Sequence, residues 1–202
     1  MISVAQTETS FYMLTPGILE AFDRNFRFRQ KFIDSAENTM KKVQKRKKNI
    51  DLYIGVHVRR TDYQDLEKVR GMNPVKASYY LEAMDLYKNY YSKQKLVFFV
   101  ISDDIAWCKA NFGKKSKNVI FASNPKMSKV DGIGHDLSLM SMMNHTILSR
   151  GSFSFWAGFM AGYGAKVYPC HFPAYQSLEH SKHICYRHPL EKPIKRIHPF
   201  TN

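Results

Sequence analysis

The feature of this sequence that most constrains its fold is the alternation of strand-like and helix-like segments between residues 50 and 170. Residues 52–58 (LYIGVHV) are apolar and β-branched over the length of a strand. Residues 96–101 (LVFFVI) are an unbroken apolar run, which is typical of a strand buried on both faces. Strands and helices alternate about five times, and this pattern predicts an α/β fold with a Rossmann-like, doubly wound parallel sheet.

Helix caps and short apolar runs locate the other elements. The pair Asn73-Pro74 predicts a helix start with the asparagine as its cap, and residues 102–104 (SDD) can cap the helix that follows the second strand. A long basic helix is expected over residues 17–46, because Phe22, Phe26, Ile33, Met40 and Val43 lie near one face. Shorter strands are expected at 118–121, 146–148 and 166–168, and shorter helices at 136–143 and 155–163.

Length and charge suggest how the chain is organised. Its 202 residues, 44% of them apolar, suffice for one well-buried domain, or for one domain plus a remnant of another. The predicted division has an N-terminal remnant and basic linker helix over 1–48, a nucleotide-binding domain over 49–180 and a basic tail over 181–202. No run of about eighteen apolar residues is present, and the first residues lack the features of a signal peptide. We therefore expect no membrane contact by this chain itself.

The net charge of +14 predicts an anionic partner, such as a nucleic acid, an acidic membrane or a phosphorylated small molecule. Much of the excess is local, since six of the eight residues from Lys41 to Lys48 are basic. Such a run is commonly a solvated helix end. A nucleic-acid-binding protein would need basic residues on one face, stacking aromatics and a recognisable module, and the sequence offers none of these.

The three cysteines do not indicate a metal site. None belongs to a CxxC pair, and no cluster has zinc-ligand spacing. Cys108 lies in a helix-like stretch and is expected to be a buried free thiol, whereas Cys170 and Cys185 form either a disulfide or two free thiols. The glycosylation sequon at Asn144 lies between a helix and a buried strand, so we interpret this asparagine as structural.

Ligands of doubly wound sheets bind beyond the carboxyl ends of the strands, so the residues just after each strand are candidates for chemistry. After the first strand, His57 and Arg59 share a face because strand side chains alternate. An arginine fork suits a diphosphate, since it makes two charge-assisted hydrogen bonds. Alternatively, Arg59 and Arg60 form a surface pair with Asp62 as their salt-bridge partner.

Carboxylates follow the second strand. Asp103 and Asp104 can bind a sugar or ribose hydroxyl or a metal, or they can cap the next helix. The chain contains no Asp-x-Asp, so a Mg²⁺-diphosphate site of the usual glycosyltransferase kind lacks its carboxylates. Arginine and backbone amides would then have to neutralise any diphosphate.

Two further segments carry candidate binding residues. Residues 151–156 (GSFSFW) stand between a strand and a helix, where a glycine and hydroxyl residues can form an anion site at the helix start. Many capped helices have the same residues and bind nothing. Asp136 is either an N-cap or a carboxylate that accepts hydrogen bonds from a guanine base.

Together these segments resemble a family. HVRRTDY (57–63), FFVISDD (98–104) and DLSLMSMMNHTILSRGSFSFWAGFMAGY (136–163) are similar to the three donor-side motifs of galactoside 2-α-L-fucosyltransferases, which form glycosyltransferase family 11. They occur in the family's order, and the third is the most specific. The resemblance covers roughly residues 50–170, whereas members of the family usually run well over 300 residues with an anchor, a stem and an acceptor-side domain. The chain therefore resembles a fragment or a truncated member.

The resemblance implies transfer of fucose from GDP-β-L-fucose to the 2-hydroxyl of a terminal galactose, with inversion, without a metal, at the lumenal side of the Golgi membrane. It implies the donor-binding half of a GT-B fold. It also implies that His57 contacts the nucleotide, Arg59 grips the diphosphate, Asp136 reads guanine and the loop hydroxyls Ser152 or Ser154 meet phosphate. Asp103 and Phe153 are expected in the same donor site, whereas Arg60 is expected to be structural.

A carboxylate should take the proton from the acceptor hydroxyl, and the candidates are Asp62, Asp65 and Glu67. Some fucosyltransferases with the H-x-R-R motif place a glutamate ten residues after the histidine, which is the position of Glu67 here. The main alternative to an active enzyme is a remnant that binds a nucleotide sugar or a glycan without turnover.

Overall fold

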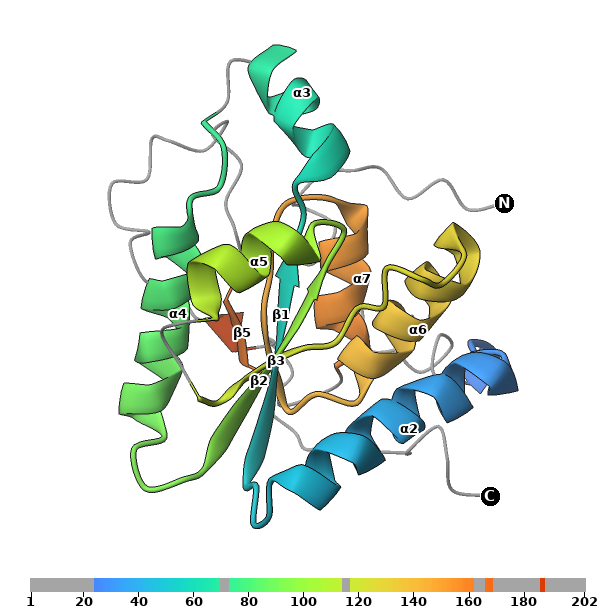
Figure 1. Ribbon diagram of the computed structural model, residues 1–202, viewed down its shortest axis with the longest axis vertical. Helices are drawn as coiled ribbons and strands as arrows, with labels where there is room; N and C mark the ends of the chain where they lie inside the picture. The colour runs from blue at the N-terminus through green and yellow to red at the C-terminus, as the bar shows by residue number, and fades with distance from the viewer. Residues whose placement is uncertain (1–23, 70–72, 114–116, 162–165, 169–185, 188–202) are drawn as a thin grey trace.

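The computed structural model describes residues 24–69, 73–113, 117–161, 166–168 and 186–187. Figure 1 shows a central sheet whose strands are nearly parallel and whose two faces carry helices. The strands are β1 (Leu52–Val58), β2 (Leu96–Ser102), β3 (Val119–Phe121), β4 (His145–Ile147), β5 (Lys166–Tyr168) and β6 (Tyr186–Arg187). The helices are α2 (Gln30–Arg46), α3 (Thr61–Val69), α4 (Ala77–Tyr90), α5 (Ile105–Phe112), α6 (Lys129–Ser141) and α7 (Ser152–Met160).

The sheet has the order β3-β2-β1-β4-β5-β6. β1 pairs in parallel with β2 on one side and with β4 on the other, and only the β5–β6 pairing is antiparallel among the described strands. The chain thus runs outward from β1 to β3, crosses back, and continues outward from β4. This reversal makes the carboxyl ends of β1 and β4 the switch point where doubly wound sheets bind ligands. The predicted Rossmann-like, doubly wound fold is confirmed.

One face of the sheet is covered by α4 and α5 (Figure 1). Tyr80 and Met84 of α4 and Phe112 of α5 are fully buried there against the β1 side chains Val56 and Val58. Burying side chains of this size contributes about 2 kcal/mol each before the entropy cost of ordering them is counted. This packing fixes the carboxyl end of β1 relative to α5.

The other face is covered by α2, α6 and α7, which the view of Figure 1 places to the right of the sheet. Ala36 of α2 and Leu139 of α6 are fully buried in this second core cluster. β1 passes close beneath α6 at Gly55, where an added Cβ would lie 2.6 Å from Met140 Sδ and 2.9 Å from Met143 Cγ. α2, the expected basic helix, therefore packs on the same sheet as α6 and α7. The domain boundary predicted between residues 48 and 49 stays a prediction.

Several element boundaries differ from those predicted. α2 starts at Gln30, and residues 26–29 are not helical. α4 starts at Ala77, so Asn73 is not its cap; Arg150 Nη1 donates to the Asn73 carbonyl at 2.8 Å, which holds the 73–76 segment in an extended course. α6 starts at Lys129, seven residues before the predicted start, because Ser128 accepts a hydrogen bond from the Asp131 N–H. α3 was not predicted.

Three smaller expectations can be compared with the structure. Cys108 is fully buried as a free thiol, as predicted, whereas Cys170 and Cys185 lie outside the described residues. Asn144 pairs with Tyr53 through both its backbone N–H and its side-chain oxygen, each at 2.9 Å, which confirms its structural role. Within the described part of the chain, every helix is too short or too polar to cross a bilayer.

Candidate functional site

The candidate residues meet at the carboxyl edge of the sheet, around the ends of β1 and β4. α3 rises from the end of β1, α7 starts just after β4, and α6 lies beside α7 (Figure 1). The turn that connects β1 to α3 carries Arg59 and Arg60, and the turn before α7 carries Gly151. The residues that follow separate strands in the sequence are thereby brought to one edge, as the fold class requires.

His57, near the end of β1, joins the two turns. Its side chain is buried, with 5% exposure, and its Nδ1 lies 2.6 Å from Ser154 Oγ in α7. Its ring also packs on Phe153, with 4.5 Å between the centroids. Burial, and secondly the neighbouring Arg59 charge, together lower the pKa of His57 to about 3. The imidazole is therefore neutral near pH 7.

The tautomer of His57 depends on where Ser154 donates its hydroxyl proton. Ser154 Oγ also lies 3.3 Å from the carbonyl oxygen of Arg150, to which only the hydroxyl can donate. A serine has a single hydroxyl proton, so when that proton goes to the carbonyl, Nδ1–H of His57 donates to the serine oxygen. Nε2 is then an acceptor, suited to an N–H or O–H group of a ligand rather than to phosphate.

Arg59 is partly exposed, with 32% of its side chain accessible, and it pairs with two carboxylates. Its Nη2 lies 2.7 Å from Asp62 Oδ2, and its Nη1 lies 3.2 Å from Asp103 Oδ2. The surface pairing with Asp62 that the sequence left open is therefore present. Both carboxylates orient the guanidinium, and a diphosphate would compete with them for it.

Tyr63 in the first turn of α3 connects Arg59 with the start of α7. The Arg59 guanidinium carbon lies 5.8 Å from the centre of the Tyr63 ring. A Cβ added to Gly151 would lie 2.5 Å from the Tyr63 hydroxyl. Arg59 and the turn before α7 therefore both lie next to the Tyr63 side chain.

The first backbone N–H groups of α7 have no backbone acceptor among the described residues. Gly151 has a φ of 101°, which side-chain-bearing residues rarely adopt, and the helix has no side-chain cap. The first N–H groups of a helix have no intrahelical acceptor, and the dipole adds a partial positive charge. Ser152 is exposed at this end, whereas Ser154 is buried and bonded to His57. Of the two predicted phosphate-binding hydroxyls, Ser152 is the accessible one.

Asp103 and Asp104 organise the turn after β1. Asp103 accepts hydrogen bonds from the Arg60 N–H at 3.0 Å, from the Thr61 N–H at 3.2 Å and from the Thr61 hydroxyl at 2.5 Å. Asp104 caps α5 by accepting from the Trp107 N–H at 3.0 Å, and it pairs with Arg60. The capping alternative is thus confirmed for Asp104, and contact of Asp103 with a donor ligand stays a prediction.

Asp136 lies in the middle of α6, so the alternative that it caps a helix is wrong. One carboxyl oxygen accepts from Ser123 Oγ at 2.7 Å, while the other, Oδ1, is shielded from solvent and has no partner among the described residues. Burial raises the pKa of Asp136 to about 7, although the Ser123 hydrogen bond opposes the shift. A buried carboxylate that lacks a partner is destabilising unless a ligand supplies a donor.

The three candidate bases differ in their surroundings. Asp62 is exposed and paired with Arg59, and Asp65 is exposed on α3. Glu67 belongs to the same helix, but its side chain lies outside the described part of the structure. No group of three His, Cys, Asp or Glu side chains suited to a metal ion is found among the described residues.

Two residues of this edge were missed by sequence reasoning. Tyr63 stands within the HVRRTDY segment, and its position in the first turn of an unpredicted helix brings it to Gly151. Ser123 follows the short strand β3, and a parallel-strand argument like that for Asp103 could have marked it. Its contact with Asp136 depends on how α6 lies beside β3, which the sequence does not indicate.

The chain is similar in sequence to known proteins. The chain is 31% identical over 174 residues to galactoside 2-alpha-L-fucosyltransferase Sec1 of Mus musculus, which covers 86% of this chain and 45% of the relative. It is 31% identical over 161 residues to galactoside alpha-(1,2)-fucosyltransferase 2 of Bos taurus, covering 79% of this chain and 44% of the relative. The chain thus spans less than half the length of these relatives.

Among solved structures, the fucosyltransferase NodZ from Bradyrhizobium shares the fold with a TM-score of 0.52 and 16% sequence identity. The likeness covers 71% of this chain and 46% of NodZ, so the described fold corresponds to about half of that enzyme. The sequence match to the family described as "Glycosyl transferase family 11" extends over residues 3–188. The chain therefore belongs to glycosyltransferase family 11.

Proposed function

We propose that this chain is the donor-binding half of an enzyme that transfers L-fucose from GDP-β-L-fucose to the 2-hydroxyl of a terminal galactose. The observation that carries the proposal is the meeting of Arg59 and the α7 N-terminus around Tyr63 and His57. The family and the names of the relatives, which are galactoside fucosyltransferases, support the donor and the acceptor.

In this proposal the diphosphate lies between Arg59 and the start of α7. Arg59 donates through its fork, and the first backbone N–H groups of α7 with the Ser152 hydroxyl donate from the other side. Phe153 and His57 border the same site. Positive charge from these groups replaces a cation, so we propose that transfer needs no metal.

The guanine base is proposed to lie against Asp136. Its N1–H and amino group would donate to the carboxylate, which would give Oδ1 the partner that it lacks among the described residues. Asp103 is proposed to stay in the donor site as the residue that orients Arg59 and the turn after β1.

The proposed chemistry is a single in-line displacement. The galactose 2-hydroxyl oxygen bonds to the anomeric carbon of fucose as the bond to the β-phosphate oxygen breaks, and the anomeric configuration inverts. The hydroxyl proton passes to a carboxylate of α3, for which Asp62, Asp65 and Glu67 are the candidates, and the negative charge remains on the GDP that leaves. Arg59 and the α7 N–H groups stabilise that charge by about 3 kcal/mol for each well-placed donor.

By likeness to its family, we propose that the enzyme works at the lumenal side of the Golgi membrane. We also propose that the chain is divided into an N-terminal region over residues 1–48, the donor-binding domain over 49–180 and a tail over 181–202. A second candidate is a protein that binds GDP-fucose or a glycan without turnover.

Calorimetry with GDP tests the proposal. Arg59→Ala should weaken GDP binding by about 100-fold or more, since about 3 kcal/mol of charge-assisted contact is lost. Arg46→Ala, at the exposed end of α2, removes the same charge outside the site and should leave affinity unchanged. Equal affinities of the wild type and Arg59→Ala would remove Arg59 from the donor site. Incubation with GDP-fucose and lactose in EDTA then separates transfer from binding alone.

A further inference from the structure

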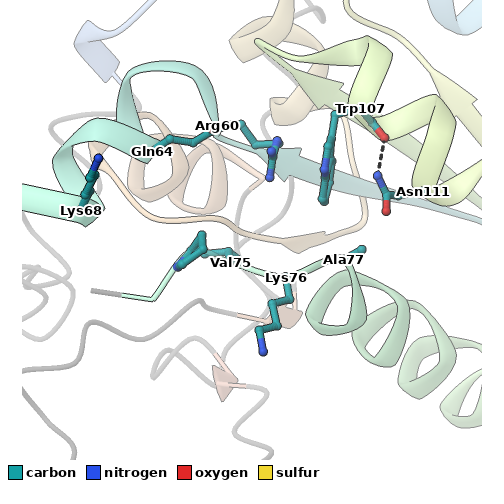
Figure 2. A pocket seen from close by; sticks show the side chains of 9 residues that line it. Arg60, Gln64, Lys68, Val75, Lys76, Ala77, Trp107 and Asn111 are labelled. Atoms are coloured by element: carbon teal, nitrogen blue, oxygen red, sulfur yellow. Dashed lines mark hydrogen bonds between the residues drawn. The ribbon is translucent and has the colours of Figure 1, made fainter. Parts of the chain in front are cut away.

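A recess opens beside the β1–α3 turn, with Arg60 of that turn in its lining. It has a volume of about 560 Å³ and lies between α3, the segment before α4, and α5 (Figure 2). A volume of this order can hold a small ligand or part of a larger one. Arg60, which the sequence left as a structural residue, forms one wall, so the recess borders the site proposed for the donor without including its residues.

Arg60 is held in this recess in a fixed orientation. Its guanidinium stacks on Trp107, with 3.9 Å from the guanidinium carbon to the ring centre, and its Nε lies 3.3 Å from Asp104 Oδ2. The side chain is only 17% exposed. No hydrogen bond to its two terminal nitrogens is found among the described residues. The outer edge of the fork is therefore pre-organised to receive an oxyanion, at little entropy cost.

The remaining walls match that chemistry. Lys68 and Lys76 stand at the rim, and the amide side chains of Gln64 and Asn111 add further donors and acceptors. Figure 2 shows these residues coming from three separate elements around Val75, which supplies apolar surface. None of the nine described residues that line the recess is acidic. The excess of positive charge favours an anion, and the amides and apolar surface favour a sugar.

We propose that this recess binds a negatively charged substituent, a sulfate or a carboxylate, carried by the glycan acceptor. The proposal rests on the proposed function, because it assigns the recess to the acceptor of that reaction. Arg60 follows Arg59 directly, and its side chain lies against Trp107, whereas Arg59 lies against Tyr63. An acceptor that reaches the fucose beside Arg59 can therefore extend past the turn to Arg60.

The probes are lactose, lactose with a sulfate on its galactose 6-hydroxyl, and inorganic sulfate. Each is titrated against the full chain at saturating GDP and constant ionic strength, by calorimetry or ligand-observed NMR. The sulfated lactose should bind about tenfold more tightly than lactose, the gain typical of one charge-assisted contact. Inorganic sulfate should bind more weakly than the sulfated sugar.

Two variants locate the effect. Arg60→Gln, and Lys68→Gln combined with Lys76→Gln, should each reduce the preference for sulfated lactose severalfold and leave GDP affinity unchanged. The lysine pair keeps the Asp104 and Trp107 contacts, so it stays informative should the Arg60 variant fold poorly. Lys45→Gln with Lys93→Gln removes the same charge from exposed positions that do not line the recess, and it should keep the preference.

Three results would overturn the proposal: equal binding of the two lactoses, equal loss of preference in the Lys45–Lys93 control, or inorganic sulfate that binds as tightly as the sulfated sugar. A large loss of GDP affinity in Arg60→Gln would also overturn it, by assigning Arg60 to the donor. Failure of the donor proposal is recognised separately, since it is measured as unchanged GDP affinity in Arg59→Ala.

Discussion

Replacement of Asp136 by asparagine should separate nucleotide binding from stability. The asparagine oxygen can keep the hydrogen bond from Ser123, but the amide NH₂ would replace the shielded Oδ1 that has no partner among the described residues. Guanine N1–H and the amide would then be two donors facing each other. Loss of two charge-assisted hydrogen bonds of about 1.5–3 kcal/mol each predicts a fall in GDP affinity of at least 100-fold.

The same substitution should stabilise the protein above pH 7. Burial raises the pKa of Asp136 from 3.8 to about 7, so the folded state favours the protonated acid. Between about pH 4 and 7 the Asp136 carboxyl is ionised in the unfolded chain but still protonated in the folded protein. Its contribution to stability is therefore lost as the pH rises through this range, and the loss is complete once the pH has passed the folded pKa. This difference in pKa would correspond to about 4 kcal/mol, and solvent screening of the partly accessible side chain reduces that to about 1–3 kcal/mol.

Urea unfolding at pH 5 and pH 8, with GDP calorimetry at pH 8, measures both effects. Asp136→Asn should raise the free energy of unfolding more at pH 8 than at pH 5. The control Asp85→Asn, at a side chain that is 67% exposed, should change neither quantity appreciably. GDP affinity within threefold of the wild type, or unfolding with the same pH dependence, would refute the role of a strained, guanine-reading carboxylate.

The remaining predictions concern the donor edge, the packing of β1 and the buried thiol. GDP-fucose should bind up to tenfold more weakly for each pH unit below 7, because Asp136 becomes protonated there. This ligand is chosen because its diphosphate is esterified at both ends. Calorimetry from pH 5.5 to 8 should show no such dependence of affinity on pH in Asp136→Asn. Gly151→Ala places a Cβ against the Tyr63 hydroxyl at a positive φ, so it should cost about 1–3 kcal/mol in urea unfolding and weaken GDP binding; an unchanged midpoint would refute the close approach. Gly55→Ala should cost about 1–3 kcal/mol in unfolding without loss of GDP affinity in the folded fraction, because its Cβ meets Met140 in the core. Since burial raises the pKa of Cys108 to about 11, peptide-resolved mass spectrometry should find it unalkylated at pH 8 in the native protein and alkylated in urea.

The sequence predicted the sheet well because local patterns carry that information. The apolar runs of β1 and β2 have no helical period, and a parallel pair buried on both faces needs such runs. The positions of the candidate residues after the strands followed from this topology. His57, Arg59 and Asp103 were therefore predicted to lie at one edge before any contact was known.

Element starts were predicted less well, because long-range contacts set them. The segment 73–76 reads as a helix start, but a bond from Arg150, 77 positions away along the chain, holds it extended. α6 starts at Lys129 rather than at Asp136, which moves Asp136 from a capping position into the middle of a helix beside Ser123. No local pattern distinguishes these two positions for the aspartate.

By itself, the sequence determined which residues could carry charge, donors and acceptors, and at which edge they would gather. Only the tertiary structure decided which of them are accessible and which are already paired. Ser152 and Ser154 are the same residue type in the same segment of the sequence. In the structure, Ser152 is exposed at a helix start and Ser154 is buried against His57. The two arginines of the turn likewise contact different rings, Arg59 that of Tyr63 and Arg60 that of Trp107. The physical reason is that burial and pairing depend on residues distant in the chain, which meet only when the sheet and its helices pack.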